Sequence, residues 1–126
     1  MEKIKAHIGL DKYKTTLSTE NLEFISDQPE SEGGTNLGPK PKELLAGALA
    51  SCIAMTVRMY ADRSNWPLDE VLVDVEVDTE TNPGTTIFTK HVEFKGDLTE
   101  EQLKRLHIIS KKCPIYKLLQ QPIVME

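Results

Sequence analysis

The chain has 126 residues and a formal net charge of −5. Its hydrophobic fraction of 39% and charged fraction of 28% are those of a globular protein and exclude a disordered or low-complexity chain. This length predicts one domain, residues 1–126, around a single core. The acidic balance argues against nucleic acid as a partner, since nucleic-acid binding needs a basic surface.

The N-terminal third is predicted to form three short strands. Residues 1–8 alternate polar and apolar side chains, which is the period of a strand, and they lack the apolar stretch of a signal peptide. Residues 13–19 and 22–26 add two strands, giving an antiparallel meander. Residues 27–41 are dense in glycine, proline and other turn formers. A loop of this length is often functional.

A long core helix is predicted next, from Pro41 to about Arg63. Proline suits the first turn of a helix, and Asn65-Trp66-Pro67 ends this one. Residues 44–57 are apolar on nearly every side, which predicts a helix buried in the core. This apolar run is shorter than the roughly 18 to 20 residues that span a bilayer. We therefore expect a cytoplasmic protein with no membrane span.

The remaining elements complete an α+β pattern. Valines at every second position from Val71 predict a strand with one solvent-exposed face. Residues 85–95 are predicted to pair with it as a hairpin, after a turn at residues 82–84. A capping box, Thr99 with Gln102, starts a helix that ends near Cys113. A short helix over residues 114–120 and a strand over residues 122–126 are predicted to follow.

Cys52 lies in the middle of the apolar helix. Its neighbours three and four positions away are almost wholly apolar: Ala48, Leu49, Met55 and Thr56. An apolar setting raises the pKa of a thiol, and even an unperturbed thiol is only ~3% ionised at pH 7. Cys52 is therefore either a buried structural cysteine or a reactive one that receives a cation or donor from elsewhere.

Cys113 has a different setting, directly before Pro114 and after Lys111 and Lys112. A residue before proline avoids the helical region, so Cys113 is predicted to be the N-cap of the helix that Pro114 begins. The helix N-terminus and the two lysines are expected to lower its pKa. Alternatively, Cys-Pro only marks a kink between two helices.

The other candidate sites are weak. The three histidines are far apart in sequence, without the spacing of metal ligands, and the glycines of the loop do not form a phosphate-binding motif. We therefore expect neither a metal nor a cofactor.

Two motifs together resemble a known family. The first runs from Gly38 through Pro41 and a small-residue helix to Cys52, and the second is Cys113-Pro114-Ile115 followed by a leucine pair. This combination resembles the OsmC family, which includes the organic hydroperoxide resistance proteins. The order of strands and helices between the motifs also agrees. The resemblance implies an intertwined α+β homodimer in which antiparallel sheets wrap around a central buried helix.

The resemblance also implies a chemistry. Cys52 would be the peroxidatic thiol, which a small-molecule hydroperoxide oxidises to a sulfenic acid. Cys113 would be the resolving thiol, which condenses with it to a disulfide that an external thiol reduces.

Peroxidases of this family activate the thiol with an arginine from the N-terminal strands and an acidic partner after the motif proline. This chain has no arginine before Arg58, so Lys12 or Lys14 would have to supply the charge. Lys42 occupies the acidic position, with Glu43 following. Nine residues of helix separate Glu43 from Cys52 by about 13 Å, so Glu43 cannot assist Cys52 of its own chain. Help for Cys52 would have to come from the partner subunit or from the loop.

Two alternatives remain beside the peroxidase. One is the same fold without catalysis, binding a hydrophobic small molecule in the dimer crevice. The other is an unrelated α+β interaction domain with structural cysteines. The distance between the two sulfurs distinguishes these hypotheses. The peroxidase and the non-catalytic form of the same fold both predict that the sulfurs lie close together, whereas sulfurs on opposite sides of the core would favour the unrelated domain.

Overall fold

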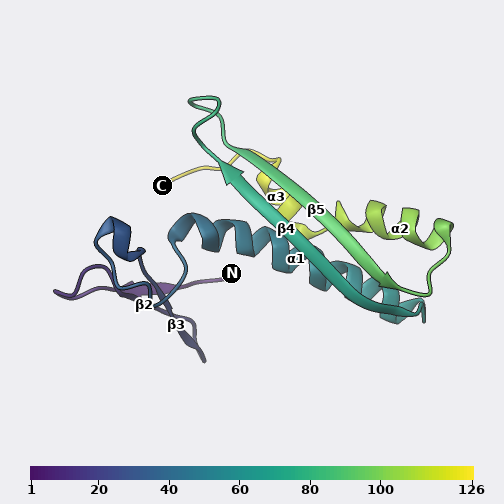
Figure 1. Ribbon diagram of the computed structural model, residues 1–126, viewed down its shortest axis with the longest axis horizontal. Coiled ribbons are helices and arrows are strands. Elements are labelled where there is room, and N and C mark those ends of the chain that lie inside the picture. The colour runs from purple at the N-terminus through teal and green to yellow at the C-terminus, as the bar shows by residue number, and fades with distance from the viewer. The chain divides into compact units, whose positions relative to one another are not determined.

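The computed structural model describes residues 1–126 and divides them into two compact units, Met1–Leu44 and Leu45–Glu126. The first unit contains the predicted antiparallel meander, with strands β1 (Lys5–His7), β2 (Thr15–Ser18) and β3 (Glu23–Ser26) in that order (Figure 1). Single-domain organisation of the whole chain stays a prediction.

Several apolar side chains of the meander are exposed. Ile4 and Ile8 flank β1 and are 52% and 49% exposed, and Phe24 on β3 is 40% exposed. The alternating pattern predicted a half-buried strand, whereas all three residues of β1 are exposed. A sheet with an uncovered apolar face needs another surface to bury it.

The loop after β3 is ordered around one carboxylate. Asp27 is only 2% exposed and accepts hydrogen bonds from the Thr35 hydroxyl at 2.6 Å and the Gln28 and Leu37 N–H groups at 2.8 and 3.2 Å. The loop also includes a short 3₁₀ turn, η1 (Glu30–Glu32). The loop is therefore a hydrogen-bonded structure around Asp27.

Helix α1 (Pro41–Arg63) has the predicted bounds. Its buried residues recur every fourth position, which places them in one stripe: Leu49, Ile53, Val57 and Ala61. This stripe makes α1 a core helix, as predicted, whereas Met55 and Met59 on α1 are 59% and 53% exposed. The apolar surface of α1 is thus wider than the surface that its own chain covers.

By length and apolar composition α1 would be able to cross a membrane, whereas the length of its uninterrupted apolar run predicts no membrane span. The helix continues beyond that run at both ends, through charged residues, to a length of 23 residues. The core helix of a folded domain has the same properties, and the buried stripe of α1 packs against a sheet as such a helix does.

The predicted hairpin consists of β4 (Leu68–Asp78) and β5 (Ile87–Gly96), paired antiparallel with Val73 opposite Val92. Strand β5 starts two residues later than predicted, since the Thr85 N–H is bound to the Asn82 carbonyl in the turn. The inward positions of the hairpin alternate with exposed ones, as predicted.

Helix α2 (Glu100–Ser110) begins with the predicted capping box of Thr99 and Gln102. Helix α3 (Pro114–Leu119) follows, with Cys113 as its N-cap. Residues 122–126 form no strand, contrary to prediction, because no neighbouring strand pairs with them.

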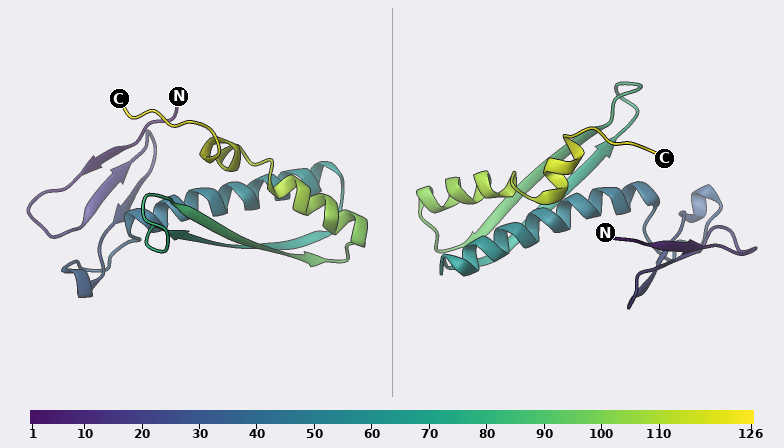
Figure 2. Two further views of the ribbon diagram at one scale, coloured as in Figure 1. Left: turned by 90° about the horizontal axis from the view of Figure 1, so that it is seen from above. Right: turned by 180° about the vertical axis from the view of Figure 1, so that it is seen from behind.

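The three helices and the hairpin form the core of the second unit, with the helices on one side of the hairpin (Figure 2). One buried cluster joins the C-terminal half of α1 to α2 and includes Val57, Ala61 and Leu106. The other joins the middle of α1 to β5 and α3 and includes both cysteines.

Candidate active site

The two cysteines come from different helices and reach the same cluster. Cys52 is partly exposed on α1, one residue from the buried stripe. Cys113 is fully buried at the start of α3, where its sulfur accepts a hydrogen bond from the Tyr116 N–H at 3.2 Å. Its N-cap position is that predicted from the Cys-Pro pair.

The thiols of Cys52 and Cys113 are hydrogen bonded to each other and are both free. The fold therefore brings together two sulfurs that are remote in sequence. A thiol pair in contact is chemically different from two isolated cysteines, because oxidation of one places an electrophilic sulfur beside the other.

The pKa of Cys113 is shifted in the direction opposite to that predicted. Burial raises it above the ordinary value of 9.0, and the hydrogen bond to Cys52 raises it further. The Tyr116 and Ile115 N–H groups at the helix start lower it, but by less. Desolvation of the thiolate thus outweighs the helix terminus, and Lys111 and Lys112 are too exposed to reverse it.

Cys113 therefore keeps its proton, and its S–H can donate to the Cys52 sulfur. Cys52 is the more exposed of the two thiols.

A cavity of about 220 Å³ lies between α1, β5 and α3, and neither cysteine is among its lining residues. Its walls include Leu49, one turn before Cys52 on α1, and Tyr116, whose N–H is bound to Cys113. Most of the lining is apolar, and Lys90 of β5 supplies its one charged side chain. Sequence reasoning did not single out Lys90, although the inward positions of its strand read Phe88, Lys90, Val92, Phe94, where a lysine is anomalous.

Glu43 and Lys42 lie in the first turn of α1 and belong to the first unit. The Glu43 carboxylate accepts a hydrogen bond from the Lys40 N–H at 2.8 Å and so caps the start of its own helix. This contact gives Glu43 a structural role within its chain. Lys42 is exposed.

Lys12 and Lys14 are exposed in the segment before β2, also in the first unit. A role for them, as for Lys42 and Glu43, stays a prediction.

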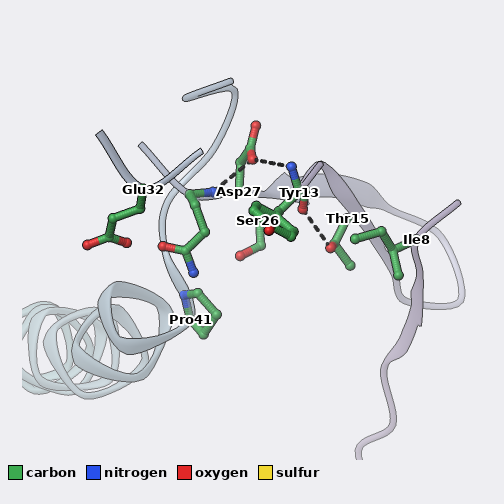
Figure 3. A pocket seen from close by; sticks show the side chains of 8 residues that line it. Ile8, Tyr13, Thr15, Ser26, Asp27, Glu32 and Pro41 are labelled. Atoms are coloured by element: carbon green, nitrogen blue, oxygen red, sulfur yellow. Dashed lines mark hydrogen bonds between the residues drawn. The ribbon is translucent and has the colours of Figure 1, made fainter. Parts of the chain in front are cut away.

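A second pocket, of about 440 Å³, lies within the first unit (Figure 3). Ile8, Tyr13, Asp27 and Pro41 are among its lining residues, and the Tyr13 N–H donates to the Asp27 carboxylate at 3.3 Å. None of the predicted site residues lines it. Across the whole chain, no cluster of three potential ligands could hold a metal ion.

Residues 33–126 match the family model described as OsmC-like protein. The chain belongs to this family. The OsmC-like match covers both cysteines, α1, the hairpin and the two C-terminal helices. No curated protein matches the chain significantly.

Solved structures of OsmC-like proteins share this fold. An OsmC-like protein from Mycoplasma pneumoniae is 24% identical, with a TM-score of 0.79, over 95% of this chain and 87% of that one. The organic hydroperoxide resistance protein OhrB of Bacillus subtilis is 23% identical, with a TM-score of 0.64, over 95% and 90%. The organic hydroperoxide resistance protein OsmC of Legionella pneumophila is 21% identical, with a TM-score of 0.67, over 95% and 89%.

These likenesses confirm the predicted fold class, an α+β architecture with antiparallel sheets and a central helix.

Proposed function

We propose that this protein is a thiol-dependent peroxidase that reduces organic hydroperoxides with Cys52 and Cys113. The observation that carries the proposal is the contact between two free thiols from different helices. Family membership and the hydroperoxide resistance proteins among its structural neighbours support the substrate class.

The difference in burial assigns the roles of the two thiols. The Cys52 thiolate, partly exposed, attacks the terminal peroxide oxygen, so the O–O bond breaks and the alkoxide leaves and takes up a proton as an alcohol. Cys52 is then a sulfenic acid. The buried Cys113 attacks its sulfur, forming a disulfide and releasing water with the Cys113 proton. Two equivalents of an external thiol reduce the disulfide.

We propose that the protein works as a homodimer. The outer face of α1, with Met55 and Met59, and the apolar residues of the N-terminal sheet, such as Ile8 and Phe24, are exposed in one chain. A second copy would bury these surfaces, since monomers rarely leave extended apolar patches in water. A cycle that begins with two thiols suits a reducing compartment, such as the cytoplasm.

The alternative is an OsmC-like module that binds a hydrophobic small molecule without catalysis. The apolar cavity between α1, β5 and α3 is the observation that favours it. In that case the thiols would have no catalytic role.

Counting free thiols separates the two functions. Reduced protein mixed with one equivalent of an alkyl hydroperoxide is expected to lose two thiols per chain, and Cys52→Ser is expected to lose none at a comparable rate. Retention of both thiols in the wild-type protein would contradict the peroxidase and favour the binding module.

A further inference from the structure

Lys90 is a charged residue on the inward face of a strand. Strand β5 alternates, and Phe88, Val92 and Phe94 on the same face belong to the apolar cluster that contains the cysteines. Lys90 pairs with Val75 of β4, which also faces that cluster. A lysine at such a position costs solvation, so its retention needs a local partner for the ammonium group.

Two partners of Lys90 lie on α3. Its ammonium group stands over the Tyr116 ring, 5.7 Å from the centroid, which is a cation–π contact. The same group is near enough to Cys113 for the thiolate charge to act on it. Lys90 also lines the cavity between α1, β5 and α3, together with Tyr116, whose N–H is bound to the Cys113 sulfur.

The apolar surroundings shift the pKa values of both Lys90 and Cys113. Burial lowers the pKa of Lys90 from its ordinary 10.5, and repulsion from Lys111 lowers it further, whereas the Cys113 thiolate raises it. Cys52 of α1 is the titratable group that faces Cys113 from the other helix. The inward residues of β4, which are Val71, Val73 and Val75, carry no charge.

The proposed cycle leaves one step without an explanation. Cys113 must act as a thiolate to attack the oxidised Cys52, but burial favours its protonated form. While Cys52 is a thiol, it adds to this preference, and its oxidation removes that contribution. A cation within reach of Cys113 would favour ionisation at this stage.

We propose that Lys90 is a positioning residue for the resolving step, in which its ammonium group favours the Cys113 thiolate that attacks the sulfenic acid of Cys52. The inference rests on the proposed function. It assigns Lys90 no part in the first oxidation, so the two steps should respond differently to loss of its charge.

The direct test measures the ionisation of Cys113 in a Cys52→Ser background, from the NMR chemical shift of its labelled β-carbon against pH. Lys90→Met keeps the stem without the charge and is expected to raise the Cys113 pKa by about one unit, so that at neutral pH the thiolate population falls about tenfold. Lys90→Arg should restore the pKa. Lys95→Met, on the exposed face of the same strand, is the matched control and should change nothing.

An unchanged Cys113 pKa in Lys90→Met, with the fold intact by the same spectra, would overturn the inference. This titration uses no peroxide, so its result does not depend on whether the protein is a peroxidase. If Lys90→Met does not fold, Lys90→Gln serves as the second uncharged variant.

The kinetic test follows the two oxidation steps in the otherwise wild-type chain. Lys90→Met is expected to form the Cys52 sulfenic acid at the wild-type rate, but to form the disulfide about tenfold more slowly at neutral pH and with a pH profile shifted to higher pH. Wild-type disulfide kinetics at every pH would contradict the role of Lys90. Failure of the wild-type protein itself to react would contradict the proposed function instead.

Discussion

The S–H of Cys113, at the start of α3, is hydrogen bonded to the sulfur of Cys52 in the middle of α1. The contact joins a fully buried thiol to a partly exposed one. In the proposed peroxidase, this contact would account for the order in which the two thiols react and would give a short path to a disulfide.

Removal of the buried thiol should stop the cycle after its first step. Cys113→Ser is expected to lose one thiol per chain with an alkyl hydroperoxide and to accumulate a Cys52 sulfenic acid, which dimedone traps and mass spectrometry detects. A serine oxygen cannot form a disulfide, so no resolution follows within the chain. Absence of the dimedone adduct, with Cys52 unmodified, would contradict the assigned roles.

The loop after β3 should lose stability in acid. The Thr35 hydroxyl and the N–H groups of Leu37 and Gln28 lower the pKa of Asp27 to about 2 from an ordinary 3.8, against the effect of burial. Because the folded-state pKa is lowered, this contribution is present above pH 3.8 and is lost as the pH falls towards 2.

Melting temperatures of the wild-type protein and Asp27→Asn measure the Asp27 contribution. Asp27→Asn should melt at a lower temperature than the wild-type protein at neutral pH. The difference between the two melting temperatures should become smaller below pH 3.8. A difference in melting temperature that does not depend on pH would show that the charge of Asp27 does not stabilise the loop.

Neighbouring isoleucines of α2 offer a matched comparison of burial. Ile109 is 6% exposed in the core beside Leu106, whereas Ile108 is 49% exposed. Ile109→Ala should lower the free energy of unfolding by about 2 to 5 kcal/mol, and Ile108→Ala by less than about 0.5 kcal/mol. Urea denaturation measures both, and equal losses would contradict the observed burial.

Two glycines should respond in opposite directions to alanine. A Cβ on Gly38 would clash with the Ile25 carbonyl oxygen, so Gly38→Ala must displace the loop from β3. A Cβ on Gly47, in α1, would meet nothing within 4 Å. Gly47→Ala is expected to stabilise the protein by about 0.5 to 1 kcal/mol through helix propensity. Thermal unfolding should show a lower melting temperature for Gly38→Ala and a higher one for Gly47→Ala.

The sequence was most informative where local patterns decide the structure. The bounds of α1, the capping box at Thr99 and the N-cap position of Cys113 all follow from residues that are neighbours in the chain. The C-terminal strand over residues 122–126 was wrong because a strand depends on a partner, which local alternation cannot supply.

Electrostatics at the site could not be predicted from local sequence alone. The helix terminus and two lysines favoured a lowered pKa for Cys113, whereas burial by α1 and β5 reverses the sign. The sequence places Lys90 among Phe88, Val92 and Phe94 on one face of β5. Which groups lie near its ammonium group depends on which helix covers that face. Tertiary packing supplies that information.

The measurement that tests the central claim most directly is peptide mapping after reaction with one equivalent of an alkyl hydroperoxide. We expect proteolysis without reduction to release one linked pair of peptides, containing Cys52 and Cys113 of the same chain, and the link to disappear after treatment with a thiol. Peptides that remain unlinked with both thiols intact, or linked only between different chains, would contradict the account.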